Sequence, residues 1–160
     1  MHIVEVNRKI DFPKETIWDT LKNFGGIYKY HPLVNNSFVL NGRDSGLGAE
    51  RMCEFNDGNK IKERIIDYTE GEEYIVDIFE KGSFPLKKAV ATINVVELDE
   101  GNSEVKFKME FKPKFGILGW LMAKGMMEKQ FKKILSQVLF GLEKHIKTGN
   151  IVGIREINTN

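Results

Sequence analysis

The sequence contains one cysteine, Cys53, and three histidines among its 160 residues. A single cysteine excludes an intramolecular disulfide and a zinc site built from several thiolates. No two histidines have a spacing typical of a metal site with a nearby carboxylate, and no cysteine-histidine pair indicates a nucleophile. Gly46-Leu47-Gly48 precedes a predicted strand rather than a helix, so it does not match a dinucleotide-binding loop. We therefore expect no metal ion, no cofactor and no catalytic residue.

Charge of one sign and long hydrophobic runs are also lacking. The net charge is +1 and the basic residues are interleaved with acidic ones, which gives no argument for nucleic-acid binding. No apolar run approaches the roughly 20 residues of a membrane-spanning helix. The N-terminus has no charged segment followed by an apolar one. These absences predict a cytoplasmic protein that binds no nucleic acid and has no integral membrane segment.

The length and composition fit a single globular domain. Hydrophobic residues make up 41% of the chain and charged residues 29%, which is typical of a domain with a sizeable core. There is no internal repeat and no linker. We expect one ligand-binding domain over residues 1–149, followed by a loosely ordered tail at residues 150–160.

The last long apolar pattern, at residues 116–147, predicts an amphipathic helix. Gly149 follows it as a helix stop. A helix of this length spans roughly 45 Å, so we expect it to lie against a sheet. Apolar side chains recur at intervals of three and four residues, at Met127, Phe131, Ile134, Val138, Leu142 and Ile146.

Alternating apolar and polar residues before this helix predict strands. A strand at residues 3–12 precedes two short helices, at 13–23 and 27–30, with Gly25-Gly26 as a break between them. Turn signals such as Asp57-Gly58 then separate strands joined by hairpins, which implies an antiparallel sheet and an α+β architecture. These further strands are expected at residues 34–40, 49–55, 60–67, 74–80, 86–98 and 103–111.

Several short motifs occur in a fixed order along the chain. They are Pro13–Leu21, His31-Pro32, Gly46–Arg51, Asp57-Gly58 with the following Lys62–Ile65, and the terminal helix. Together they resemble the helix-grip fold of the START-like (SRPBCC) superfamily, specifically its polyketide cyclase/dehydrase and lipid-transport branch, over about residues 2–148. The resemblance implies a curved antiparallel sheet of about six to seven strands around a long C-terminal helix, with two short helices after the first strand. It also implies a cavity between sheet and helix, entered near the short helices and the loop before the long helix.

The helix-grip fold hosts hydrophobic-ligand carriers, aromatase/cyclases and proteins without an assigned activity. The first hypothesis is a carrier or sensor that binds a small hydrophobic or lipid-like molecule in the cavity, and the scarcity of polar groups favours it over catalysis. The alternative is a polyketide cyclase or dehydratase, in which Arg51, Glu63, Tyr74 and His31 would orient the substrate and move protons. A second alternative is a membrane or protein interaction module that uses the segment Phe115–Met127, and a homodimer stays open.

Arg51 and Glu63 are the first candidates for ligand binding. If residues 56–58 form a three-residue loop with a glycine bulge, Arg51 faces Glu63 across the hairpin. Both would then point inward among apolar neighbours, where a charge must be paired. The pair would hold a ligand carboxylate, carbonyl or phenol, or would form a cross-strand ion pair without a ligand role. A slip of one residue would place Arg51 opposite Arg64 instead.

The remaining candidates are side chains expected to line the cavity. Tyr28 and Tyr30 lie where the resemblance places the entrance. His31 would be a general base or a hydrogen-bonding group at the rim, although the His31-Pro32 step also simply ends a helix. Tyr74 alternates with inward apolar residues and would offer a hydroxyl. Arg8 has the inward parity of its strand and would be a second anchor, or its head group leaves at the sheet edge. Further ligand-binding residues are expected at Phe107, Trp120, Met127 and Phe131.

The segment Phe115–Met127 is more apolar than one helix face requires. Methionine side chains adapt to ligands of varied shape, and Gly116, Gly119 and Gly125 would let the segment bend. These features favour a flexible gate. Ordinary core packing and an exposed patch for a membrane or a second subunit are the alternatives.

Overall fold

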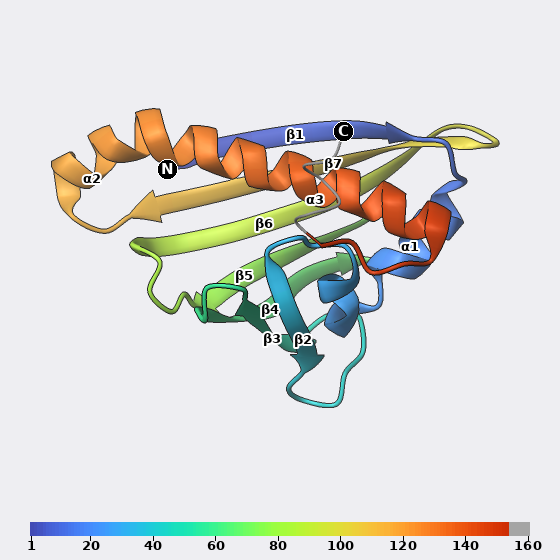
Figure 1. Ribbon diagram of the computed structural model, residues 1–160, viewed down its shortest axis with the longest axis horizontal. Helices are drawn as coiled ribbons and strands as arrows, with labels where there is room; N and C mark the ends of the chain where they lie inside the picture. Colours follow the sequence, from blue (N-terminus) through green and yellow to red (C-terminus); the bar gives the residue numbers. More distant parts are fainter. Residues whose placement is uncertain (154–160) are drawn as a thin grey trace.

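A curved sheet of seven antiparallel strands wraps around a long C-terminal helix in the computed structural model, which describes residues 1–153 (Figure 1). The spatial order of the strands is β1-β7-β6-β5-β4-β3-β2. The strands are β1 (His2–Ile10), β2 (Val34–Val39), β3 (Glu50–Phe55), β4 (Lys60–Thr69), β5 (Glu73–Glu80), β6 (Leu86–Asp99) and β7 (Asn102–Pro113). The helices are α1 (Lys14–Leu21), the 3-10 helix η1 (Phe24–Lys29), α2 (Gly116–Met122), the π-helical turn η2 (Ala123–Met127) and α3 (Glu128–Thr148). This arrangement is the predicted helix-grip fold.

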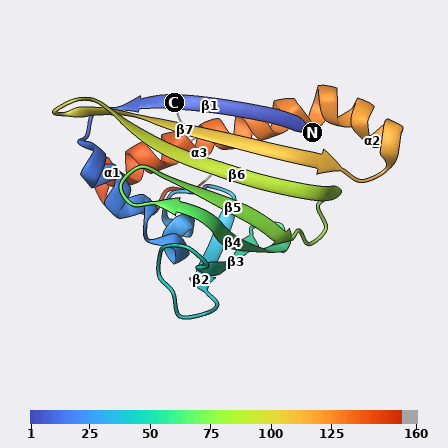
Figure 2. The same ribbon diagram turned by 180° about the vertical axis from the view of Figure 1, so that it is seen from behind.

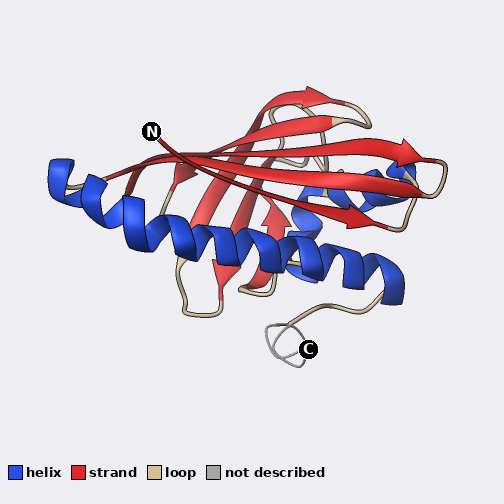
Figure 3. Cartoon of the chain, turned by 90° about the horizontal axis from the view of Figure 1, so that it is seen from above, coloured by secondary structure: helices blue, strands red, loops and turns tan. Residues whose placement is uncertain are grey.

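The sheet is built from consecutive hairpins between β2 and β7, and β1 completes it by pairing with β7 (Figure 2). The two edge strands, β1 and β2, are joined through α1 and η1. Residues on β1, β5 and β7 alternate between buried and more exposed positions, because successive side chains of a strand point to opposite faces. One face of the sheet therefore forms the core, and α3 lies across it (Figure 3).

The helix α3 buries one apolar stripe, including Leu135, Val138 and Leu142. Gly149 ends the helix as predicted: it has a φ of 73°, and its N–H donates to the carbonyl of His145 over 2.8 Å. A left-handed residue at this position satisfies a carbonyl that the helix leaves without a partner. The predicted single helix is, however, interrupted at residues 123–127 by η2.

Of the two alternatives for Arg8, the second anchor was wrong, since Arg8 does not line the cavity between sheet and helix. Its side chain is 38% exposed on the edge strand β1, which agrees with a head group that leaves at the sheet edge. Its Nε donates to the Glu143 carboxylate of α3, and its guanidinium lies 5.1 Å from the centre of the Phe140 ring. Arg8 therefore ties the edge strand β1 to α3.

The prediction that Gly25 and Gly26 separate two helices was wrong, because both residues lie inside η1. A Cβ on Gly25 would lie 3.0 Å from Cγ2 of Val39, so the glycine lets η1 approach β2 closely. Ser37 of β2 fixes this contact, because its hydroxyl donates to the Gly25 carbonyl (2.6 Å) and accepts from the Tyr28 N–H (3.2 Å).

The expected loose tail begins with an ordered contact. Val152 is buried, and its N–H donates to the carbonyl of Lys29 over 2.9 Å. The chain after α3 therefore packs on η1. The remainder of the predicted tail, residues 154–160, lies outside the described residues.

Gly141 marks the closest approach of α3 to the segment after η1. A Cβ at this position would lie 2.1 Å from the carbonyl oxygen of Tyr30, so Gly141→Ala should lower the free energy of unfolding by about 1–3 kcal/mol in urea denaturation. The matched control is Gly125→Ala, whose Cβ meets no atom within 4 Å. That change should be neutral or stabilising by up to about 1 kcal/mol. Equal effects of the two substitutions would contradict the close approach.

Candidate functional site

A cavity of about 100 Å³ lies between the inner face of the sheet and the first half of α3. Its wall is mostly apolar, and four residues with polar side chains interrupt it: His31, Arg51, Glu63 and Lys81. The apolar wall includes Ile78, Ala91, Ile93 and Phe107 from the strands, and Phe131 and Ile134 from α3.

Arg51 faces Glu63 across the β3–β4 hairpin, as predicted. The hairpin register follows from the Phe55 N–H, which donates to the Asn59 carbonyl over 2.8 Å and closes the three-residue loop. Both side chains are buried, with exposed fractions of 3% for Arg51 and 6% for Glu63. Because a lone buried charge is very unfavourable, such a pair must be tightly matched.

The Arg51 Nε joins the pair by donating to Glu63 Oε2 over 2.5 Å. Three further contacts hold the pair in place. The Arg51 Nη1 donates to the Phe24 carbonyl over 2.9 Å. The guanidinium carbon lies 3.9 Å from the centre of the Phe24 ring, a geometry in which the ring attracts a cation. The Cys53 thiol donates to the same Glu63 oxygen over 3.3 Å. The pair thus links β3 and β4 to η1.

The electrostatics of the site keep Arg51 charged and Cys53 neutral. Burial is the largest single effect on the pKa of Arg51 and lowers it, but the Glu63 carboxylate, together with smaller effects of Cys53 and Tyr74, holds that pKa above its ordinary value. Burial raises the pKa of the Cys53 thiol well above its usual range, and Glu63 adds to the effect. Since the thiolate is the reactive form, the site offers a fixed ion pair and an inert thiol.

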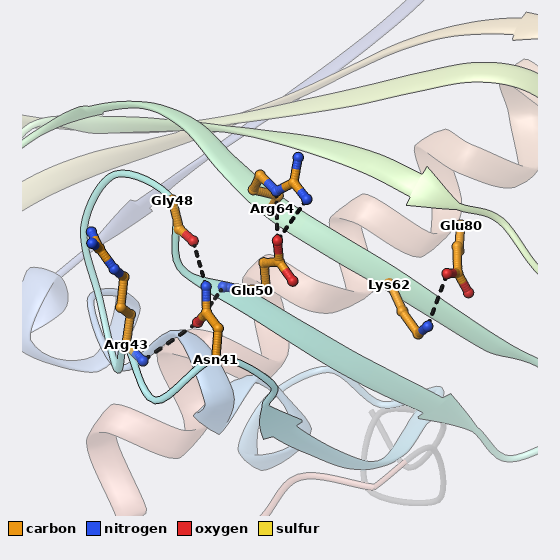
Figure 4. Close-up of polar contacts among 7 residues, drawn as sticks. All are labelled: Asn41, Arg43, Gly48, Glu50, Lys62, Arg64 and Glu80. Atoms are coloured by element: carbon orange, nitrogen blue, oxygen red, sulfur yellow. Dashed lines mark hydrogen bonds and ion pairs between the residues drawn. The ribbon is translucent and has the colours of Figure 1, made fainter.

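The opposite face of the same strands carries ion pairs that reach solvent (Figure 4). Glu50 accepts from the Arg64 Nε over 2.7 Å, and the Lys62 Nζ donates to Glu80 over 2.8 Å. Exposed pairs of this kind contribute little to stability. The pairing of Glu50 with Arg64 also excludes the slipped register in which Arg51 would face Arg64.

His31 lies on the cavity wall beside Phe55, with the two ring centres 5.9 Å apart and the rings nearly perpendicular. Its Nδ1 accepts the Leu33 N–H over 3.3 Å, which places the proton of the neutral ring on Nε2. Burial lowers the pKa of His31 to about 4, against a smaller opposing effect of Glu63. The ring is therefore neutral at pH 7.

Tyr30 and Tyr74 form a buried pair beside this site. Burial raises the pKa of Tyr30 to about 12 and that of Tyr74 well above its usual value. Tyr74 packs against Trp18 and Phe24, with ring centres 5.9 and 6.1 Å away. Neither hydroxyl reaches another group of the described chain at ordinary hydrogen-bond geometry.

The cavity wall includes five of the nine predicted ligand-binding residues. Those five are Arg51, Glu63, His31, Phe107 and Phe131. The other four lie elsewhere: Tyr74 inside the core, Tyr28 and Met127 partly buried at its edge, and Trp120 half exposed beside His2.

Sequence reasoning missed Phe24, Lys81 and Phe84. Phe24 contributes a backbone carbonyl and a ring face to Arg51. A pattern of side chains does not predict where a backbone carbonyl will point. Lys81 and Phe84 come from the loop between β5 and β6, where no periodicity indicates which way a side chain points. Within residues 1–153, no three His, Cys, Asp or Glu side chains converge in a way that could hold a metal ion.

The segment Phe115–Met127 is not core. Only Gly119 and Ala123 are buried there, whereas the large apolar side chains of α2 are exposed. The core alternative for this segment was therefore wrong.

The buried ion pair should show strong non-additivity in a double-mutant cycle. Arg51→Leu and Glu63→Leu should each lower the free energy of unfolding by about 3–5 kcal/mol, because each leaves a buried charge without its partner. The double variant should lose only about 1–3 kcal/mol, since the main remaining defect is the Phe24 carbonyl without its donor. Urea denaturation checks this prediction. The prediction would be contradicted if the double variant lost as much free energy of unfolding as the two single variants lose together.

His31 should make stability depend on pH below neutrality. The unfolded state takes up a proton near pH 6.5, whereas the folded state takes it up only near pH 4. The contribution of the neutral ring is therefore complete above pH 6.5 and falls as the pH drops towards 4, by about 3 kcal/mol in total. Denaturation of the protein and of His31→Gln at pH 7 and pH 4 isolates this effect. An equal loss of stability in both proteins would contradict it.

Comparisons with known proteins place the chain in a family. The family described as polyketide cyclase / dehydrase and lipid transport matches residues 1–147. A comparison with curated protein sequences finds no significant match. Among solved structures, a START superfamily protein from Mycobacterium smegmatis is similar with a TM-score of 0.75 at 14% identity, covering 94% of this chain and all of the other.

Two further structures share the fold. The protein XoxI from Bacillus cereus has a TM-score of 0.75 at 21% identity, with 92% of this chain and 97% of that one covered. Norcoclaurine synthase from Thalictrum flavum, in complex with dopamine and hydroxybenzaldehyde, has a TM-score of 0.68 at 16% identity, with 91% and 86% covered. These likenesses extend over nearly the whole chain, as does the family match. The protein is therefore a member of the polyketide cyclase/dehydrase and lipid transport family, with the helix-grip fold of the START superfamily.

Proposed function

We propose that the protein is a carrier or sensor that binds a small hydrophobic molecule with a neutral polar group in the cavity between the sheet and α3. The observation that carries this proposal is the buried Arg51–Glu63 pair on an otherwise apolar wall. Apolar pockets with a few well-placed polar groups are typical of sites for small molecules.

The chemistry of the pair favours a hydroxyl or phenol over a carboxylate. A hydroxyl can accept a hydrogen bond from Arg51 and donate one to Glu63 at the same time. Arg51 has five N–H donors, of which one contacts Glu63 and one contacts Phe24. A ligand carboxylate would instead stand beside the Glu63 carboxylate in a site with little water, where like charges repel strongly.

The size of the cavity favours a single ring or a short aliphatic group. A cavity of about 100 Å³ is smaller than the about 300–1,000 Å³ of pockets for drug-sized ligands and closer to the about 150 Å³ that holds benzene. Dopamine and hydroxybenzaldehyde, present in the norcoclaurine synthase complex, are single-ring compounds. These compounds support the proposal that the cavity of this protein holds a single-ring ligand.

Three probes of similar size test the choice of polar group: phenol, toluene and benzoate. In isothermal titration, phenol should bind about tenfold more tightly than toluene, because only phenol hydrogen-bonds to the charged pair. Benzoate should bind more weakly than phenol because of Glu63. The Arg51→Leu/Glu63→Leu double variant should bind toluene at least as tightly as phenol.

A second substitution tests the location of the site. Ala91 lies on the cavity wall and is buried, so Ala91→Leu should fill the cavity and abolish phenol binding while the protein stays folded by circular dichroism. Equal affinity for all three probes would contradict the role of the pair. Unchanged phenol binding by Ala91→Leu would contradict the cavity as the site. Native mass spectrometry of the freshly expressed protein then identifies any molecule that co-purifies.

A further inference from the structure

An exposed apolar surface lies on α2 and the turn that follows it. Its members, here called the α2 patch, are Phe115, Ile117, Leu118, Leu121, Met122 and Met126. The exposed fraction reaches 81% for Ile117 and 74% for Leu118. Exposed apolar side chains that gather in one place indicate an interaction surface.

A left-handed residue directs the chain into this patch. Phe115 has a φ of 73° and an exposed fraction of 75%. A bulky residue is strained in this conformation, and its exposed ring gains little from burial in return. A positive φ favours glycine, so an exposed phenylalanine at position 115 is unusual.

Lysines flank the patch along the chain. Residues 112–133 contain six lysines and one acidic residue, Glu128, in a chain whose net charge is only +1. Glu128 is hydrogen-bonded to His2, whose Nδ1 lies 2.7 Å from Oε1. No ion pair joins any of the six to an acidic residue of the described chain. The lysines are Lys112, Lys114, Lys124, Lys129, Lys132 and Lys133.

The patch lies at one end of the molecule, beyond the ends of the central strands (Figures 1 and 2). Lys87, Lys112 and Lys114 gather with Phe115 and Trp120 around a surface hollow there. The Lys114 N–H donates to the Pro85 carbonyl over 2.9 Å, which joins this end to the loop that contributes Lys81 and Phe84 to the cavity wall. The patch and this side of the cavity therefore share one end of the sheet.

We propose that the α2 patch docks on a lipid surface that carries negative charge. Apolar side chains would enter the boundary between head groups and acyl chains, and the lysines would contact the anionic head groups. No helix within residues 1–153 is long and apolar enough to cross a membrane, so the attachment is peripheral. This docking does not depend on which ligand the cavity holds.

Two other occupants fit the surface less well. A symmetric second copy would bring the same lysines against each other, because both partners of a two-fold interface present the same surface. A protein partner would be recognised by several directional hydrogen bonds besides apolar contacts, but apart from the flanking lysines, residues 115–123 offer only the Trp120 N–H as a side-chain donor. A lipid bilayer can bind the patch without directional hydrogen bonds from its side chains.

Flotation with vesicles tests the proposal. The protein should float with vesicles of equal parts phosphatidylcholine and phosphatidylglycerol, and not with vesicles of phosphatidylcholine alone. Removing lysines with Lys114→Gln and Lys124→Gln should weaken binding about fivefold for each lysine. The matched control is Lys9→Gln with Lys147→Gln, two exposed lysines outside the patch, which should bind as the unmodified protein does.

The apolar part of the patch has its own variants. Ile117→Ser with Leu118→Ser should reduce vesicle binding at least tenfold, whereas Ile66→Ser with Leu98→Ser, two exposed apolar residues on β4 and β6, should not. Phe115→Gly should raise the melting temperature, because it removes the strain of a left-handed phenylalanine, and should still weaken vesicle binding.

Three results would overturn the proposal. The first is no flotation of the unmodified protein with anionic vesicles. The second is equal flotation of the patch variants and their controls. The third is a dimer in analytical ultracentrifugation that Ile117→Ser with Leu118→Ser dissociates, since a second copy would then cover the patch. The phenol titration is independent of all three, so failure of docking and failure of the cavity site can be told apart.

Discussion

The buried ion pair between Arg51 and Glu63 is the interaction on which the site depends. It joins the β3–β4 hairpin to η1 through the Phe24 carbonyl and ring, and so fixes one wall of the cavity. It also places two opposite charges beside an apolar space, where each interaction is stronger than in water. The same feature therefore contributes to local stability and, under the proposed function, selects the polar group of the ligand.

The pair was predictable because the side-chain alternation of strands and the Asp57-Gly58 turn together specify a register. Tyr74 shows the limit of that reasoning. Its inward parity was read correctly, since it is fully buried, but Trp18 and Phe24 pack against it and it is not part of the cavity wall. The odd or even position of a residue along a strand determines which face of the sheet its side chain occupies. Whether a cavity remains beside that side chain depends on the helices packed on the same face.

The C-terminal helix combines two parts with different surroundings. From Glu128 to Thr148 an apolar stripe faces the sheet, and the periodicity of the apolar residues was sufficient to predict this part of the helix. From Gly116 to Met127 every residue except Lys124 is apolar or glycine, so no single helix face stands out and the sequence alone could not distinguish gate, core and interaction surface. The π-helical turn η2 separates the two parts, and α2 lies past the sheet with most of its apolar side chains in solvent.

The most direct test of the ligand site observes the Arg51 guanidinium itself by NMR with isotope-labelled arginine. The Arg51 Nε–H, which is buried against Glu63, should exchange with solvent far more slowly than that of the exposed Arg43. Its resonance should shift on titration with phenol and much less with toluene. Fast exchange, or a resonance that phenol leaves unchanged, would contradict the assignment of this pair as the polar anchor of the cavity.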